Sequence, residues 1–310
     1  MSVRASHLSK RYGNFTAVQD LSFEVPTGSI FGFVGPNGAG KTTTLRILAA
    51  LLSPTSGEAW ISGESVIQRP RLVRQKVGYM PDFFGVYDDL TVTEYLHFYA
   101  HSHGVPRSRR QRVVADLLEL IDLVEKRSAF VNTLSRGMKQ RLGLARCLVH
   151  DPEVLLLDEP ASGLDPRARI DMREILRELQ KMGKTILVSS HILPELADLC
   201  THLGIVNHGQ VVIHGTVADV LARARVGQSV IVRTLDKSNV VAERLRTWPG
   251  VSRVAMESDG IVADLVADDE AMSALLRSLV EDGLPVVEFR KRSGGLEELF
   301  LAATGEQGGA

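Results

Sequence analysis

The sequence predicts an α/β domain with a buried parallel sheet, followed by a smaller α+β domain. Short apolar runs at residues 30–34, 154–157 and 185–189 each end in polar groups, a pattern typical of strands that are buried on both faces. Beyond about Gly227 the pattern becomes strand, helix, strand, strand, helix, strand, which indicates a ferredoxin-like module. We therefore expect a first domain at residues 1–220 and an accessory domain at 227–310.

The first 80 residues read as short strands and turns around one helix. Gly, Pro, Asn and Ser mark the turns at residues 12–14, 26–28 and 53–57, because these residue types favour turn conformations. The expected strands are Val3–Lys10, Ala17–Val25, 30–34, Glu58–Ile61 and Arg74–Met80, and the expected helix is Leu45–Leu52.

Apolar residues recur at helical spacing from about Thr93 to Val149, which predicts a helical region. After the strand at 154–157, the remaining elements of the first domain are a helix at Ile170–Met182, a strand at 185–189 and a hairpin at Leu203–His214. The accessory domain is expected to contain strands at Ser229–Thr234, Val251–Met256, Ile261–Val266 and Val286–Phe289, and helices at Val240–Thr247, Glu270–Glu281 and Leu296–Ala302.

Residues 35–42 match the phosphate-binding pattern G-x-x-x-x-G-K-[ST] between a buried strand and a helix. Glycines let successive backbone N–H groups approach a phosphate, and the helix adds its positive N-terminal dipole. In this arrangement Lys41 reaches the β and γ phosphates and Thr42 enters the Mg²⁺ shell. The pattern indicates a nucleoside triphosphate site, with a glycine-rich turn of no such role as the alternative. The expected nucleotide-binding residues here are Gly35, Pro36, Asn37, Gly38, Ala39, Gly40, Lys41, Thr42 and Thr43.

Asp158 and Glu159 follow the buried strand at 154–157. Two adjacent acids in that place are costly unless they meet cations or polarised water. Asp158 is therefore the expected Mg²⁺ partner through its water shell, and Glu159 the carboxylate that orients or deprotonates an attacking water. A strand that simply ends in a polar loop is the alternative. Because ligands bind at the carboxyl ends of parallel strands, we expect these acids to converge with the phosphate loop.

Leu134 to Gln140 place a serine, Ser135, before a second helix start that also contains a glycine. Such a helix N-terminus can bind an anion. Since the chain already has one phosphate cradle, a second one is useful if it serves a nucleotide held by another subunit.

The composition limits the classes of partner. The net charge of −1 gives no sign of a general polyanion partner. The dense basic run at 107–112 is interpreted as a solvated helix start, with nucleic acid or lipid headgroups as alternatives. Two cysteines, Cys147 and Cys200, indicate a reducing compartment. No stretch approaches the ~20 apolar residues that cross a bilayer, so we expect any membrane role to come through a partner.

With these motifs in this order, residues 1–220 resemble the ATP-binding subunits of ATP-binding cassette (ABC) transporters. The resemblance implies a P-loop NTPase (ABC ATPase) core with an antiparallel β subdomain and an α-helical subdomain at about 83–150. It implies ATP and Mg²⁺ as ligands, and the chain lacks the N/T-K-x-D sequence that would favour GTP.

The same resemblance extends to single residues outside the phosphate loop. Ser135 and Gly137 are similar to the family's signature, and Asp165 to the end of a loop at 162–165 that crosses the dimer interface. His191 is similar to the switch histidine on the γ-phosphate, and Tyr12 to an aromatic residue that stacks on adenine. Taken alone, the histidine and the tyrosine would more often be ordinary loop and turn residues.

Three positions depart from the family pattern. Arg136 and Met138 stand where the signature commonly has glycine and glutamine, and Asp82 stands where the family usually has glutamine. Aspartate is one methylene shorter and is charged, so we expect Asp82 to hold Mg²⁺ or water and to couple differently to a membrane partner.

The signature and the C-terminal appendage resemble the drug and antibiotic exporter branch, in which the ATPase and the membrane subunit are separate chains. This implies a head-to-tail homodimer that hydrolyses ATP and drives an integral membrane permease subunit. The protein would be cytoplasmic and peripheral on the inner face of the cell membrane, without a nucleic acid partner.

The alternatives are an ABC-type ATPase acting on nucleic acid or ribosomes and, more remotely, a small-molecule kinase. Each motif occurs once and no heptads persist between residues 43 and 134, which disfavours the first. A kinase would not need the second helix start at 134–140.

Overall fold

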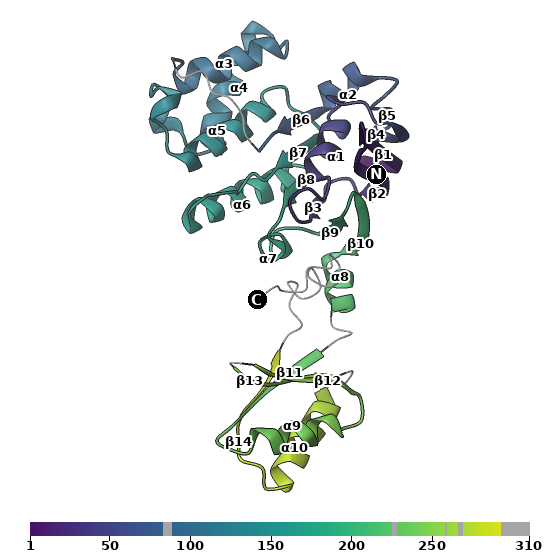
Figure 1. The fold of residues 1–310 in the computed structure, drawn as a ribbon. Helices are drawn as coiled ribbons and strands as arrows, with labels where there is room; N and C mark the ends of the chain where they lie inside the picture. The colour runs from purple at the N-terminus through teal and green to yellow at the C-terminus, as the bar shows by residue number, and fades with distance from the viewer. Residues whose placement is uncertain (83–88, 225–227, 258, 266–268, 293–310) are drawn as a thin grey trace. The chain divides into compact units, whose positions relative to one another are not determined.

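The computed structural model describes residues 1–82, 89–224, 228–257, 259–265 and 269–292. The chain divides into two compact units, Met1–Val217 and Ala218–Ala310 (Figure 1). Each unit has its own sheet structure and its own hydrophobic core.

An antiparallel sheet is formed by the first strands of the chain in the order β2-β1-β4-β5. Its hairpin turns at Gly13, whose φ of 56° lies in the left-handed region that glycine adopts readily. The strands are β1 (Val3–Tyr12), β2 (Phe15–Val25), β4 (Ser56–Ile61) and β5 (Glu64–Ser65).

The strand predicted at Arg74–Met80 is wrong over its first three residues. Helix α2 (Pro70–Lys76) precedes β6 (Val77–Met80). Pro70 occupies the start of this helix, where a missing N–H does no harm, and Val73 turns into the core.

The central sheet has the strand order β10-β9-β3-β8-β7-β6. All neighbours are parallel except β9 and β10, which form the predicted hairpin. Every residue of β3, β7 and β8 is buried, as the apolar runs predict. The strands are β3 (Ile30–Val34), β6, β7 (Val154–Asp158), β8 (Thr185–Ser190), β9 (His202–Asn207) and β10 (Gln210–Thr216).

The two faces of β3 pack differently. Phe31 and Phe33 point into the core, where their rings lie 5.6 Å and 5.3 Å from that of Phe23 in β2. On the other face a Cβ on Gly32 would lie 2.6 Å from Leu203 and 3.0 Å from Leu196. The short helix α7 (Leu193–Ala197) can therefore approach the sheet closely at this point.

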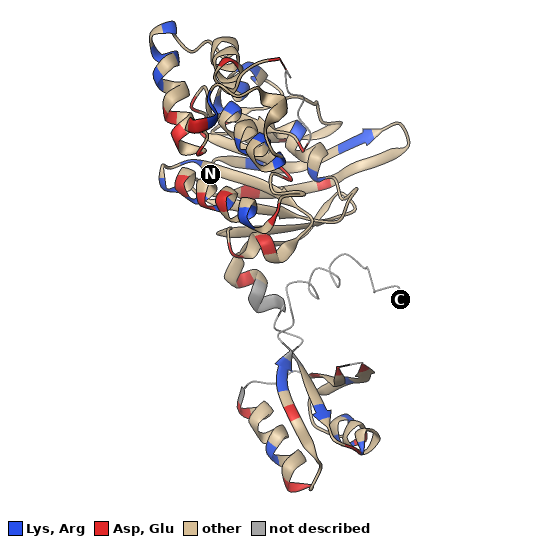
Figure 2. Cartoon of the chain, turned by 90° about the vertical axis from the view of Figure 1, so that its left-hand side faces the viewer, with Lys and Arg blue, Asp and Glu red and all other residues tan. Residues whose placement is uncertain are grey.

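The helical region of the first unit is built from α3 (Val92–Ser102), α4 (Arg107–Leu120) and α5 (Arg136–Leu148), with short 3₁₀ turns at Val124–Lys126 and Val131–Thr133. The basic run at 107–112 forms the first half of α4 and is largely exposed, as a solvated helix start. In Figure 2, Lys and Arg are interspersed with Asp and Glu along the helices. The other helices of this unit are α1 (Lys41–Leu48) and α6 (Pro166–Lys181), and α8 (Val217–Ala224) begins at the boundary.

The second unit is an antiparallel sheet with two helices on one face. Its strand order is β12-β13-β11-β14, and every neighbouring pair is antiparallel. Buried aliphatic side chains of the strands and both helices form its core. The helix predicted at Leu296–Ala302 lies outside the described residues. The elements are β11 (Gln228–Thr234), α9 (Ser238–Arg246), β12 (Val251–Glu257), β13 (Gly260–Leu265), α10 (Asp269–Glu281) and β14 (Val286–Arg292).

Candidate nucleotide site

The predicted phosphate loop leaves β3 and turns directly into α1. Gly38 and Gly40 have φ values of 83° and 98°, and a Cβ on Gly40 would lie 2.4 Å from the carbonyl oxygen of Ala17. A Cβ on Gly35 would lie 2.3 Å from the carbonyl oxygen of Val206. Close backbone contacts thus require glycine at positions 35 and 40. The first turn of α1 has no acidic residue that would repel an anion.

Lys41 lies at the start of α1 with only 6% of its side chain exposed. Its ammonium group donates to the carbonyl oxygens of Gly35, at 2.5 Å, and Pro36, at 3.2 Å. Its Nζ also lies 3.5 Å from Oε1 of Glu159. Burial lowers the pKa of Lys41, while the charge of Glu159 opposes that shift.

Ser189 joins the two acids predicted from the sequence. Its hydroxyl donates to Oδ1 of Asp158 at 2.6 Å and accepts a bond of 3.0 Å from the backbone N–H of Glu159. The φ of Glu159 is 49°, so the chain turns sharply at the end of β7. Sequence reasoning missed Ser189, although its place at the end of a buried strand was a usable signal.

The oxygen atoms at this strand end suit a hard cation such as Mg²⁺. Asp158 is 1% exposed, and within the part of the chain that the structure describes its Oδ2 atom has no hydrogen-bond partner. A buried carboxylate oxygen of this kind needs a cation or polarised water. Thr42 and Asp82 supply further oxygen atoms and line the same pocket as Glu159. Mg²⁺ typically takes one or two carboxylates and keeps several waters.

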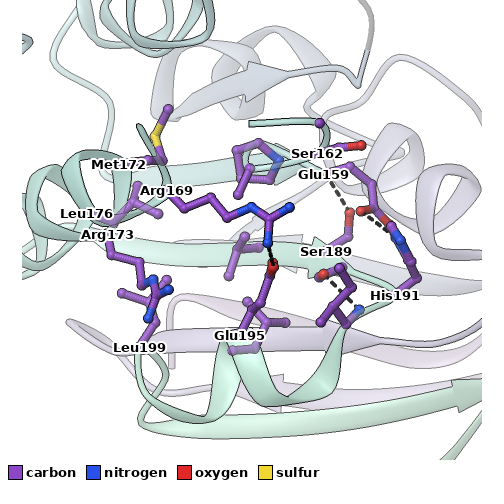
Figure 3. A pocket seen from close by; sticks show the side chains of 17 residues that line it. Glu159, Ser162, Arg169, Met172, Arg173, Leu176, Ser189, His191, Glu195 and Leu199 are labelled. Atoms are coloured by element: carbon purple, nitrogen blue, oxygen red, sulfur yellow. Dashed lines mark hydrogen bonds and ion pairs between the residues drawn. The ribbon is translucent and has the colours of Figure 1, made fainter. Parts of the chain in front are cut away.

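His191 follows β8 and meets Glu159 from the neighbouring strand. Its Nδ1 atom lies 2.9 Å from Oε2 of Glu159, and 45% of its side chain is exposed (Figure 3). The structure thus brings the loop, Asp82, Glu159 and His191 into one pocket.

Tyr12 lies beside this pocket but does not line it. It pairs with Phe15 across the β1–β2 hairpin, and Lys10 lies 5.3 Å from the centre of its ring. Phe15 is the aromatic residue that lines the pocket with the phosphate loop. The sequence signal for both residues is the same, because they flank the turn at residues 13 and 14.

Ser135, Gly137 and Asp165 form a second group, at the N-termini of α5 and α6. Ser135 Oγ accepts from the N–H of Met138 at 3.3 Å, and Asp165 Oδ1 accepts from the N–H of Ala168 at 2.9 Å. A Cβ on Gly137 would lie 3.0 Å from that of Ala168, so the two helix starts touch. None of the three lines the pocket of the phosphate loop.

Arg136 makes an unpredicted contact between this helix start and the loop at 162–165. A Cβ on Gly163 would lie 2.3 Å from the guanidinium carbon of Arg136. The glycine, with a φ of 65°, therefore leaves room for the arginine that replaces the signature glycine.

The chain is similar to known ATP-binding proteins along nearly all of its length. A family model described as ABC transporter matches residues 18–162. Nod factor export ATP-binding protein I of Burkholderia orbicola is 38% identical over 301 residues, which cover 97% of this chain and 96% of that protein. Linearmycin resistance ATP-binding protein LnrL of Bacillus subtilis is 30% identical over 306 residues, covering 98% of each chain.

Solved structures match about seven tenths of the chain. An ATP-binding subunit of an ABC transporter is 30% identical with a TM-score of 0.65, and the match covers 72% of this chain and 93% of that one. CbiO1 of Clostridium perfringens, part of an ABC transporter complex, is 25% identical with a TM-score of 0.64, covering 71% of this chain and 90% of that one.

Proposed function

The chain belongs to the ATP-binding proteins of ABC transporters, and we propose that it powers an exporter by closing with a second copy of itself over two ATP molecules. As an ABC ATPase it binds and hydrolyses ATP. Every helix that the structure describes is too short or too polar to cross a lipid bilayer. In our proposal the chain acts on a separate integral membrane permease and is peripheral on the inner face of the membrane.

The phosphate loop and the start of α1 hold the triphosphate of ATP. In the proposal, backbone N–H groups of residues 37, 38 and 40–42 and the helix dipole face the phosphates, and Lys41 supplies the compact charge for the β and γ groups. Thr42, Asp158 and Asp82 would hold Mg²⁺ through oxygen atoms, a role that fits Oδ2 of Asp158, which has no hydrogen-bond partner among the described residues. Mg²⁺, when bound, neutralises charge that develops between the β and γ phosphates. Either Tyr12 or Phe15 stacks on the adenine ring.

Glu159 and His191 act on the attacking water. The carboxylate of Glu159 accepts a proton from the water as the water oxygen attacks the γ-phosphorus, while the bond from that phosphorus to the β–γ bridging oxygen breaks and ADP leaves. The bonds that Ser189 makes to Asp158 and to the Glu159 N–H keep the carboxylate in place. His191, 2.9 Å from Glu159, orients the carboxylate and contacts the γ-phosphate.

The observation that carries the dimer proposal is the separation of the two groups of site residues within one chain. The start of α5, with Ser135 and Gly137, has no acidic residue in its first turn and suits an anion, and Asp165 lies at the adjoining start of α6. None of the three lines the phosphate-loop pocket. In a head-to-tail dimer with two-fold symmetry, each chain presents these residues to the nucleotide of the other. Opening and closing of the pair then drives the permease.

We propose that the exported compound is hydrophobic or drug-like, a proposal supported by the relatives, one of which is named for Nod factor export and another for linearmycin resistance. The second unit has the element and strand order of a ferredoxin-like domain. We propose that it is an accessory domain of the dimer and that it does not bind nucleotide.

Membrane recruitment tests this function. The tagged chain is produced with and without a candidate permease, and membranes and ribosomes are separated on a density gradient. The chain should float with membranes only when the permease is present, and Lys41→Ala should float equally because recruitment does not require ATP. Sedimentation with ribosomes, or with nucleic acid, would support the alternative ATPase instead.

A further inference from the structure

Arg169 connects the loop at 162–165 with helix α7, beside the candidate site. On α6 its Nε donates to the carbonyl oxygen of Leu164 at 3.0 Å, and its Nη1 donates to Oε1 of Glu195 at 2.5 Å. Leu164 belongs to the loop at 162–165, and Glu195 lies in the first turn of α7, just after His191. Figure 3 shows the guanidinium pointing at Glu195, with His191 joined to Glu159 on the other side of the pocket.

The surroundings make this ion pair stronger than a surface pair. The Arg169 and Glu195 side chains are 33% and 20% exposed, and they border a pocket that the side chains of Met172, Leu176 and Leu199 also line. A charge pair in apolar surroundings is screened less than an exposed one. The planar fork of arginine also serves two acceptors in a fixed geometry, which a lysine would not do.

Packing of α6 on α7 does not depend on Arg169. Arg173 and Arg177, one and two turns further along α6, also reach the segment after His191. Arg173 pairs with Oδ2 of Asp198 at 3.8 Å, and Arg177 donates to the Asp198 carbonyl oxygen at 2.7 Å. Arg169 differs from both because it also bonds the 162–165 loop.

We propose that Arg169 is a positioning residue that transmits the state of the 162–165 loop, through Glu195 and α7, to His191 and Glu159. The inference rests on the proposed function, in which that loop contacts the partner subunit. When the loop is held at the dimer interface, Arg169 and Glu195 hold the start of α7, and His191 is aligned with Glu159. Without the bonds of Arg169, ATP still binds, but His191 and Glu159 are no longer aligned for hydrolysis.

The test is a double-mutant cycle of Arg169→Gln and Glu195→Gln in the full-length chain, with Arg173→Gln as the matched control on the same face of α6. ATP hydrolysis gives kcat and KM, and thermal unfolding reports the fold. We expect each single variant to lower kcat about tenfold, because small misplacements of catalytic groups reduce rates strongly. KM should change less than twofold. The double variant should be no slower than the slower single variant, and the control should keep the wild-type rate.

Several results would overturn the inference. A wild-type kcat in Arg169→Gln would show that the residue has no positioning role. Effects of the two single variants that multiply in the double variant would show that Arg169 and Glu195 act independently. A change of KM together with a change of melting temperature would show that Arg169 has a structural role only. A wild-type protein that neither hydrolyses ATP nor dimerises with it would instead defeat the proposed function, so the two failures are distinguishable.

Discussion

The ammonium nitrogen of Lys41 lies 3.5 Å from a carboxylate oxygen of Glu159, and both side chains are nearly buried. Removal from water disfavours the charged form of the lysine and lowers its pKa, and the charge of the glutamate opposes this shift. The same carboxylate would repel the phosphates of a nucleotide in the pocket. In our proposal Glu159 therefore opposes nucleotide binding and promotes hydrolysis.

Replacing Glu159 by glutamine should separate these two effects. The variant keeps the size of the side chain but loses its charge and its basicity. We expect ATP to bind at least as tightly as in the wild type, and kcat to fall by about 10²- to 10⁴-fold, the usual contribution of a general base. Equilibrium binding of a fluorescent ATP analogue and steady-state phosphate release measure the two quantities.

A matched control for this variant is Glu178→Gln, which removes an exposed glutamate that pairs with Lys181 on α6. It should hydrolyse ATP at the wild-type rate. Light scattering should show ATP-dependent dimers of Glu159→Gln that persist because hydrolysis no longer separates them. Full turnover by Glu159→Gln would exclude it as the base.

Asp82 gives a second prediction, because it lines the pocket where the family usually has glutamine. Removing one oxygen ligand from the Mg²⁺ shell should affect the reaction more than ground-state binding. We expect Asp82→Ala to lower permease-stimulated ATP hydrolysis several-fold more than it lowers affinity for ATP, whereas Asp82→Gln should retain more of the stimulation. Unchanged binding together with full stimulated turnover in Asp82→Ala would remove Asp82 from the site.

His150, two residues after α5, gives a prediction for the pH dependence of the stability of the first unit. Its ring stacks on that of His103 at 4.1 Å, and its Nε2 lies 3.0 Å from the carbonyl oxygen of Val77. Burial lowers the pKa of His150 to about 4, and His103 and Lys184 act in the same direction, whereas the Val77 hydrogen bond and Asp151 oppose it. The folded chain therefore holds a neutral imidazole in the range where a free histidine, with a pKa near 6.5, takes up a proton.

The sign of the effect follows from proton binding. Below pH 6.5 the unfolded chain binds a proton that the folded chain does not, so stability is complete above that pH and falls as the pH approaches 4. The loss at pH 5 is about 2 kcal/mol for this residue. We expect His150→Gln to lose less stability than the wild type between pH 7.5 and 5, as measured by denaturant unfolding. His101→Gln, an exposed substitution on α3, should lose as much stability as the wild type. If His150→Gln also loses as much stability as the wild type between pH 7.5 and 5, His150 is not the source of the effect.

Much of the fold could be predicted because its signals are local. The buried strands at β3, β7 and β8 are short apolar runs that end in polar residues, and the structure confirms all three to within one residue. The hairpin around residues 207–209 and the order of elements in the second unit were also predictable from turns and periodicity. Helix α2 was missed because its seven residues carry one buried side chain, Val73, and so show no helical period.

The contacts of the site were harder to predict, because they join segments that are far apart in the sequence. Ser189 was expected only as the end of a strand, and its bonds to Asp158 and Glu159 depend on β7 and β8 being neighbours. The contact between Arg136 and Gly163 joins the start of α5 to the loop at 162–165, and the link from Arg169 to Glu195 joins α6 to α7. No local pattern encodes such pairs.

Mixing two inactive variants tests the central claim most directly. Lys41→Ala removes the phosphate-loop charge and Ser135→Arg blocks the second helix start. Both sites of each homodimer should therefore be inactive. In the mixed dimer, one site combines an intact Lys41 with an intact Ser135 from the other chain, and a random mixture should recover up to about a quarter of wild-type hydrolysis. Two different affinity tags verify that mixed dimers form. Recovered ATP hydrolysis is the predicted result, and a mixture that forms mixed dimers yet stays inactive would contradict the account.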